Sequence, residues 1–240
     1  MARAAIVTVG NELLAGDVEN TNGSWLARRL AALGVEVALI ASIGDEIDRV
    51  ASFVREQAGV FDVVIVTGGL GGTPDDVTRE SIAAAFGVSQ AEVPDVAARL
   101  RVRFSHDPEY AARWAQLPVG SRPLEITNGG APGFVIENVY VLPGLPSEME
   151  AMFDTIAGEL RDGSPIGTWR RSYRTTEARI VGVLEEMTAL HPGVAVGSYP
   201  SFDGGVSEVE VVVKSADHDA LAAAAAWIEP ALDRVTSASR

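Results

Sequence analysis

The stretch FDVVIVTGGLGGTPDD, residues 61–76, carries the strongest structural signal in the sequence. Its first half is a continuous apolar run, which is typical of a strand buried on both faces of a parallel sheet. The glycines that follow leave backbone N–H groups bare, and such groups at the start of a helix suit an anion such as phosphate. Two carboxylates, Asp75 and Asp76, come next, where the negative charge of a phosphate would lie.

Strands and helices alternate on both sides of this stretch. Further apolar runs of strand length lie at residues 4–9 and 35–43. Helical periodicity follows each of the three strands and closes at a glycine, over residues 20–34, 45–59 and 75–87. Parallel strands joined in this way pack helices on both faces of an open sheet. The sequence therefore predicts an α/β fold with three layers around an open, mostly parallel sheet.

The region after residue 87 departs from this alternation. It contains an arginine-rich helical insertion (88–118), a short strand (124–127), a hairpin turning at Glu137 and Asn138 (134–144) and a closing helix (146–160). Residues 161–169 are the best linker candidate, and a β-α-β-β-α pattern follows over residues 170–236. We therefore expect an α/β domain over residues 1–162 and a small α+β domain over residues 170–240.

The composition restricts the class of protein. Nearly half of the residues are apolar, which supports a folded core, and there is no cysteine for a disulfide or a thiolate metal site. With no signal-peptide pattern and no apolar stretch of about 20 residues, we expect a cytoplasmic protein without a membrane partner. A net charge of −14, with Lys214 as the only lysine, argues against a nucleic-acid partner. Both a halophilic, salt-adapted source and a GC-rich genome are consistent with this acidity.

The segment Thr73-Pro74-Asp75-Asp76 has two interpretations. In the first, Thr73 caps the following helix, Pro74 occupies its first turn and both aspartates complement the helix dipole. In the second, the aspartates hold a divalent cation such as Mg²⁺, which bridges carboxylates to phosphate oxygens. Two acids beside a phosphate-binding loop exceed what a cap requires. The second interpretation therefore indicates a metal-bound phosphate ester or anhydride as the ligand.

Polar residues also follow the first and second strands. Gly10 and Glu12 come after the first strand, with Asn22 at the start of the next helix, and Asp45 follows the second strand. Asp45 also suits the N-cap of the helix after it. The carboxyl ends of parallel strands meet at one edge of a sheet, where ligands bind. We therefore expect Glu12 and Asp45 to converge there with the two aspartates of the glycine loop.

Five motifs follow one another in the order VTVGNELLAGDVENTN, IGDEIDRV, TGGLGGTPDDVTRE, NGGAPGF and LPGLPSEMEAMF. Together they resemble the amino-terminal domain of the competence/damage-inducible protein A (CinA) family, within the molybdopterin-binding (MoaB/Mog-like) fold. The later segments EARIVGVLEEM and VAVGSYPSF also resemble a domain fused to some eukaryotic FAD synthases. One departure concerns the glycine loop, which commonly reads TGGLGPT in the family. Here Gly72 replaces its proline, and Pro74 stands where a polar residue is usual.

The resemblance implies a site for a nucleotide-like or pterin-like phosphate ligand. Matching positions assign Asp45 and Asp76 to catalysis, and Asp75 and Asp76 to a divalent metal, Mg²⁺ or a similar ion. The expected phosphate- or nucleotide-binding residues are Gly10, Glu12, Asn22, Gly68, Gly69, Gly71, Thr73, Pro143, Gly144 and Pro146. Because family members often associate, we also expect a homo-oligomer.

The leading functional hypothesis is metal-dependent hydrolysis of a nucleotide diphosphate linkage. It follows from the resemblance, since CinA-like domains are associated with ADP-ribose pyrophosphatase activity. Two alternatives stay open: molybdopterin binding or adenylyl transfer in molybdenum cofactor biosynthesis, and a non-catalytic nucleotide-binding module.

Overall fold

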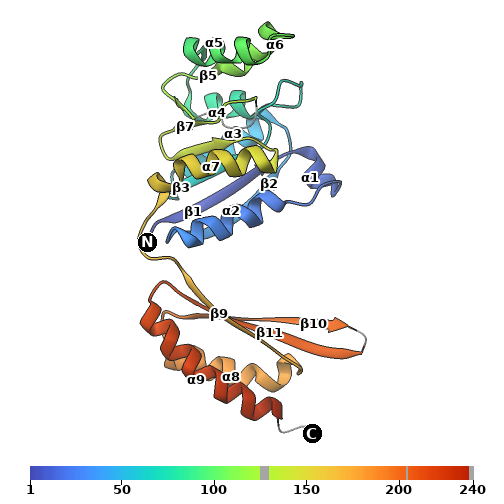
Figure 1. Cartoon of the computed structure of the whole chain (residues 1–240), viewed down its shortest axis with the longest axis vertical. Coiled ribbons are helices and arrows are strands. Elements are labelled where there is room, and N and C mark those ends of the chain that lie inside the picture. Colours follow the sequence, from blue (N-terminus) through green and yellow to red (C-terminus); the bar gives the residue numbers. More distant parts are fainter. Residues whose placement is uncertain (125–129, 204, 238–240) are drawn as a thin grey trace. The chain divides into compact units, whose positions relative to one another are not determined.

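The computed structural model describes residues 1–124, 130–203 and 205–237. The chain divides into two compact units, Met1–Gly163 and Ser164–Arg240, and each is described here by itself (Figure 1). The strand predicted over residues 124–127 lies outside the described residues, apart from Leu124.

The first unit is built on a six-stranded sheet in the order β2-β1-β3-β8-β7-β6. The strands are β1 (Arg3–Val9), β2 (Glu36–Ile43), β3 (Val63–Thr67), β6 (Arg122–Pro123), β7 (Phe134–Ile136) and β8 (Val139–Leu142). Four of them, β2, β1, β3 and β8, run parallel, while β7 and β6 add antiparallel pairs at one side. The parallel pairing brings the carboxyl ends of β1, β2, β3 and β8 to one edge of the sheet.

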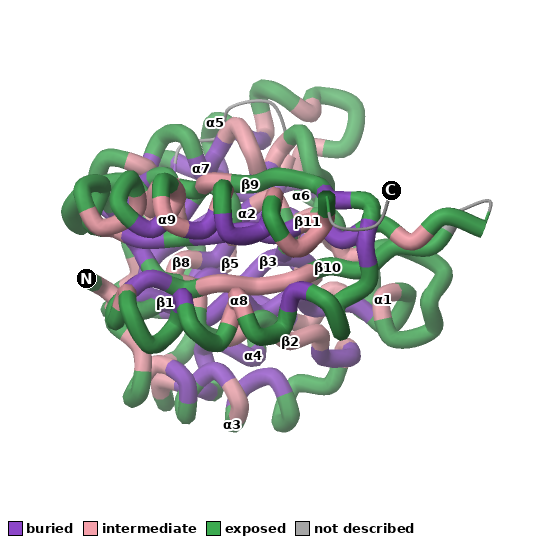
Figure 2. The backbone as a smooth tube through the Cα atoms, turned by 90° about the horizontal axis from the view of Figure 1, so that it is seen from below, coloured by how far each residue is buried: buried purple, intermediate pink, exposed green. Residues whose placement is uncertain are grey.

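Helices cover both faces of this sheet. They are α2 (Thr21–Ala32), α3 (Ile47–Ala58), α4 (Thr78–Phe86) and α7 (Pro146–Leu160), whereas the residues of the short helix α1 (Asn11–Ala15), which follows β1, are not buried. Leu26 of α2 and Phe153 of α7 enter the core on one face, and Val54 of α3 and Ile82 of α4 enter the core on the other. In Figure 2 the helices alternate between buried and exposed colours, as expected for helices that pack on one side only. The predicted three-layer α/β fold is confirmed.

The arginine-rich insertion forms a small lobe of its own. Strands β4 (Gln90–Glu92) and β5 (Gln116–Pro118) pair antiparallel and enclose helices α5 (Pro94–Arg103) and α6 (Pro108–Ala112) and the 3₁₀ helix η1 (Arg113–Ala115). Val96 and Leu100 lie at the centre of the lobe. Trp114 packs against both this cluster and the main core, so it joins the lobe to the sheet.

The second unit follows the predicted β-α-β-β-α order. Its elements are β9 (Gly167–Tyr173), α8 (Glu177–Leu190), β10 (Ala195–Asp203), β11 (Val206–Ser215) and α9 (His218–Ser237). The strands form an antiparallel sheet in the order β10-β11-β9, and Ile180 of α8 and Ile228 of α9 pack with Val211 of β11 in its core. Within the described ranges, the molecule contains no helix whose length and apolar character would let it cross a membrane.

The β7–β8 hairpin turns at Glu137 and Asn138, as the sequence predicts. Glu137 has a φ of 50°, and among the described residues it is the one non-glycine residue with a positive φ. Asn138 donates from Nδ2 to the carbonyl oxygens of Ala58 and Phe61 at 2.9 and 2.8 Å. Two-residue hairpin turns with positive φ at the first central position favour glycine there.

Glu137→Gly should therefore raise the free energy of unfolding by up to about 1 kcal/mol, because glycine avoids the left-handed strain of a side chain. Asn138→Ala should lower it by about 1–3 kcal/mol, because two carbonyl groups lose their donor. Urea denaturation measures both changes. A Glu137→Gly variant less stable than the wild type would contradict this account of the turn.

Candidate functional site

Two glycines let the ends of the central strands approach each other. Gly68 has a φ of 105°, and a Cβ built on it would lie 2.2 Å from the carbonyl oxygen of Val9 at the end of β1. Gly69 has a φ of 64°, and its Cβ would lie 2.3 Å from Oγ1 of Thr78. Only glycine fits both positions, so the first two residues after β3 place no side chain over the sheet edge.

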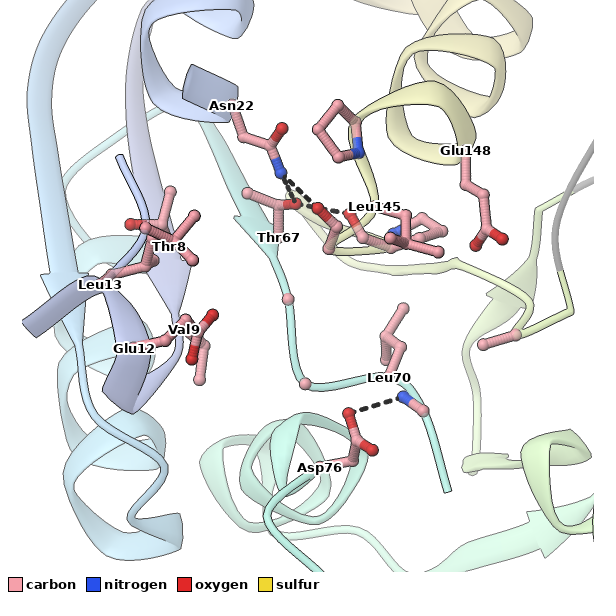
Figure 3. A pocket seen from close by; sticks show the side chains of 18 of the residues that line it. Thr8, Val9, Glu12, Leu13, Asn22, Thr67, Leu70, Asp76, Leu145 and Glu148 are labelled. Carbon is pink, nitrogen blue, oxygen red and sulfur yellow. Dashed lines mark hydrogen bonds between the residues drawn. The ribbon is translucent and has the colours of Figure 1, made fainter. Parts of the chain in front are cut away.

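A pocket of about 520 Å³ opens at this edge (Figure 3). Its lining comes from the ends of β1, β3 and β8, from the first turns of α1, α2 and α7, and from η1. The expected site residues that line it are Glu12, Asn22, Gly68, Gly69, Gly71, Asp76, Pro143, Gly144 and Pro146. Its place at the carboxyl edge of a parallel sheet is where such folds bind their ligands.

The other expected site residues lie outside this lining. Gly10 adjoins it, because a Cβ on Gly10 would lie 2.3 Å from Oε1 of Glu12. Thr73 lines a second pocket of about 450 Å³, formed behind residues 71–76, and Asp76 lines both pockets. Asp75 is exposed to solvent, and Asp45 is half-buried near the start of α1.

Asn22 offers an unpaired acceptor at the pocket. Its Nδ2 donates to the carbonyl oxygen of Gly144 at 2.8 Å and to Oγ1 of Thr67 at 3.3 Å, which fixes the orientation of the amide (Figure 3). Its Oδ1 is buried and has no hydrogen-bond partner among the described residues. The two donated hydrogen bonds hold the amide in this orientation, although an unpaired buried acceptor costs about 1–3 kcal/mol.

Asp76 occupies the backbone donors that the sequence assigned to a phosphate. Its Oδ1 accepts from the N–H of Gly71 at 2.8 Å, and its Oδ2 accepts from the N–H of Thr73 at 2.8 Å and from the Thr73 hydroxyl. Helix α4 begins only at Thr78, with Val77 at its N-cap, so the interpretation of Thr73 as a helix cap is wrong. The aspartate is instead the anion that the glycine loop binds.

A buried arginine holds the same loop from the other side. The side chain of Arg79 donates to the carbonyl oxygen of Leu70 and to that of Gly71, the latter at 2.7 Å. Only 6% of the residue is exposed, and this burial lowers the pKa of its guanidinium, while Glu80 and Asp76 act in the opposite direction. Since Asp76 binds N–H groups and Arg79 binds carbonyl groups, the loop backbone is fixed on both sides.

Asp45 is tied to the first loop rather than to α3. Its Oδ2 accepts from the N–H of Asn11 at 2.8 Å, and Oδ1 of Asn11 accepts from the N–H of Asp45 at 3.2 Å. Helix α3 begins at Ile47 with Glu46 at its N-cap, and no side chain of the described residues caps it, so the interpretation of Asp45 as its cap is wrong. Burial raises the pKa of Asp45; the Asn11 N–H opposes this shift, and the negative charges of the other three expected acids add to it.

These acids have the right chemistry for a hard divalent cation but do not surround one point. Carboxylate oxygens are preferred Mg²⁺ ligands, and Glu12 and Asp76 line the same pocket. In the part of the chain that the structure describes, no group of three or more His, Cys, Asp or Glu residues is placed to hold a metal ion. The residues therefore fit a cation that takes one or two protein carboxylates and completes its shell with phosphate and water, as Mg²⁺ usually does.

Known proteins are similar to the first unit in sequence and in fold. The family model described as "Probable molybdopterin binding domain" matches residues 5–162, a span that contains the whole pocket lining. The crystal structure of CinA from Thermoplasma acidophilum has a TM-score of 0.63 and 32% identity to the chain, covering 67% of this chain and 99% of that one. The chain belongs to the CinA-like molybdopterin-binding domain family.

Other similarities of this CinA-like chain extend past the pocket. The family model "FAD synthase, middle domain" matches residues 172–238, within the second unit. A protein of Archaeoglobus fulgidus is 38% identical over 198 residues, which cover 81% of this chain and 84% of that protein. A CinA-like protein of Frankia casuarinae is 44% identical over 164 residues, which cover 63% of this chain but 38% of that protein. This chain therefore corresponds to less than half of the Frankia protein.

Sequence reasoning missed several pocket residues, of which three carry chemistry. Thr67, the last residue of β3, donates from Oγ1 to the carbonyl oxygen of Pro143 at 2.6 Å. Glu148 lies in the first turn of α7, and burial raises its pKa while Arg103 opposes the shift. The predicted topology could have identified Thr67 and Glu148 as pocket residues, since both lie at the predicted sheet edge. Trp114 comes from the insertion, and no local pattern pointed to it.

Asp76→Asn should lower the free energy of unfolding by about 1–3 kcal/mol, because the amide group has one acceptor oxygen and turns its NH₂ toward a backbone donor. Asp75→Asn is the matched control, since Asp75 is exposed and the N–H groups of Gly71 and Thr73 donate to Asp76, and it should change stability less than Asp76→Asn does. Urea denaturation of the two variants measures the difference. Equal effects would show that the loop does not depend on the Asp76 carboxylate.

Asp45→Asn should stabilise the protein at neutral pH. A raised pKa means that the folded state binds the proton more tightly than the unfolded state, so ionised Asp45 opposes folding above its folded pKa. The amide keeps an acceptor for the Asn11 N–H and removes the charge. The gain in melting temperature should be full at about pH 7 and vanish below the ordinary carboxyl pKa of 3.8. A gain that stays constant on acidification would contradict the assignment.

Proposed function

We propose that this chain hydrolyses a nucleotide diphosphate linkage, of the ADP-ribose type, with the help of a divalent cation. The observation that carries the proposal is that Glu12 and Asp76 line the same pocket as the glycine turn after β3. Carboxylates alone would repel a diphosphate, whereas a cation between the two negative groups attracts both.

The loop residues prepare the pocket for the diphosphate. Gly68 and Gly69 leave the strand ends open, so phosphate oxygens have access to the backbone. Asp76 already accepts three hydrogen bonds, and a carboxylate has about four lone-pair sites, so it retains capacity for a further partner at the pocket. Arg79 keeps the loop in this shape through the Leu70 and Gly71 carbonyl groups.

Hydrolysis also requires a proton acceptor. Water adds to one phosphorus, the bridging P–O bond breaks, and AMP and ribose 5-phosphate result. Glu148 is the pocket carboxylate suited to take the proton of that water, because its raised pKa makes it a stronger base than an exposed carboxylate. When bound, the cation polarises a phosphoryl oxygen and makes the water more acidic.

Incubation of the purified chain with ADP-ribose and Mg²⁺ or Mn²⁺ should release AMP, and a chelator should stop the reaction. Asp76→Asn should lower the rate by on the order of a hundredfold, because it alters a carboxylate expected to hold the cation. Asp95→Asn, on the exposed first turn of α5, should leave the rate unchanged. If no divalent cation supports AMP release, the proposed reaction is wrong.

A second candidate function is molybdopterin binding or adenylyl transfer in molybdenum cofactor biosynthesis. The observation in its favour is the match of residues 5–162 to a family described by molybdopterin binding. Calorimetry with molybdopterin and an assay of AMP transfer from ATP test it. Tight ADP-ribose binding without products over a long incubation would instead favour a non-catalytic nucleotide-binding module.

A further inference from the structure

The insertion contributes a rigid aromatic side chain to the pocket. Trp114 of η1 lines the pocket and makes edge-on contacts with Phe104 and Tyr110, with ring centroids 5.1 and 5.7 Å apart. It also packs against two hydrophobic clusters, one inside the insertion and one on the face of the main sheet that α3 and α4 cover. A ring held by so many neighbours keeps its orientation, so a ligand meets a preformed indole.

Two glycines let the indole lie against the chain. A Cβ on Gly130 would lie 2.4 Å from Cζ3 of Trp114, and a Cβ on Gly72 would lie 2.9 Å from its Nε1 and 2.4 Å from Oη of Tyr110. These contacts involve opposite ends of the indole, so both ends abut glycine backbone. Gly72 is the position at which this chain departs from the proline common in the family. The aromatic pair therefore occupies space that a proline ring would need.

The pocket lining has polar and apolar parts. Figure 3 shows apolar side chains such as Leu13, Leu70 and Leu145 interspersed with polar ones such as Thr8, Glu12 and Glu148. Trp114 extends the apolar part, and its Nε1 is a buried donor with no partner among the described residues. A flat ring in a ligand matches a rigid indole that lines the same pocket.

We propose that Trp114 recognises the heterocyclic ring of the ligand and makes the pocket selective for phosphate esters that carry a flat bicycle. The shared chemistry is that of a purine or a pterin. The inference rests on the proposed function in one respect: the same pocket binds the phosphorylated ligand. Stacking of a base on an aromatic side chain is worth about 5-fold to 150-fold in affinity.

Calorimetry with Mg²⁺ present tests this selectivity with three probes: AMP, neopterin monophosphate and ribose 5-phosphate, which has no ring system of this kind. Trp114→Ala should weaken binding of the ring-bearing probe by about fivefold or more and change ribose 5-phosphate binding by less than about twofold. Trp114→Phe keeps an aromatic ring and should give an intermediate loss. Whether AMP or neopterin monophosphate shows the larger loss identifies the ring.

Indole fluorescence provides a measurement that would not respond to the ligand if Trp114 had only a structural role. The ring-bearing probe should quench the emission of the wild type, and Trp114→Phe should abolish that quenching. Trp227→Phe is the matched control, because Trp227 lies in the core of the second unit, and it should keep the quenching.

Gly72→Ala is a second variant that leaves the indole in the chain. The added methyl group would displace Tyr110 and Trp114, so it should reduce affinity for the ring-bearing probe more than affinity for ribose 5-phosphate. Adding Tyr110→Phe removes the hydroxyl group nearest to the methyl and should restore part of the loss.

Equal losses for ring-bearing and ringless probes in Trp114→Ala would overturn the inference, because they would indicate a structural role alone. Unchanged affinity, or a wild type that binds neither AMP nor the pterin, would overturn it too. Parallel assays of ADP-ribose cleavage separate the two proposals. Ring-selective binding without cleavage supports the role of Trp114 and refutes hydrolysis, whereas cleavage without ring selectivity refutes the role of Trp114 and supports hydrolysis.

Discussion

Close approach of backbone to backbone at the end of β3 is the constraint on which the pocket depends. Gly68 lies against the carbonyl group of Val9, and a Cβ on Gly144 would lie 3.2 Å from the Cα of Gly68. Three strand ends therefore meet without side chains between them. Polar side chains hold this junction: Thr67 binds the chain after β8, and Asn22 reaches it from α2. A cavity remains because main chain, not side chain, forms its floor.

The charged side chains at the glycine loop stabilise the loop backbone itself. Asp76 satisfies backbone N–H groups that would otherwise lack partners, and buried Arg79 satisfies the carbonyl groups of the same turn. The apparent conflict between acids and a phosphate thus has a structural explanation in the loop itself. Under the proposed function a cation gives the same carboxylate a second task, since its lone pairs are not all engaged.

The sequence was sufficient where local pattern and global topology agree. Apolar runs indicated buried strands, and parallel topology then required their polar ends to share an edge, which is where Glu12, Asn22 and Asp76 lie. Local signals failed where tertiary contacts competed with them. Aspartate often caps helices, but the carboxylate of Asp45 accepts a hydrogen bond from the N–H of Asn11, 34 positions away in the chain. The sequence could not place Trp114 in the pocket, because its position depends on how the insertion packs against the sheet.

The glycine loop lines two cavities: Gly71 and Asp76 line the first, and Gly72, Thr73, Pro74 and again Asp76 line the second. The second cavity is also lined by Gln90 of β4 and Gln116 of β5, which do not line the first. Natural or engineered substitutions at Gln90 and Gln116 should therefore change how rigidly the glycine loop is held. A library that varied only the residues of the first cavity would leave out the side chains that line the second cavity beside the same loop.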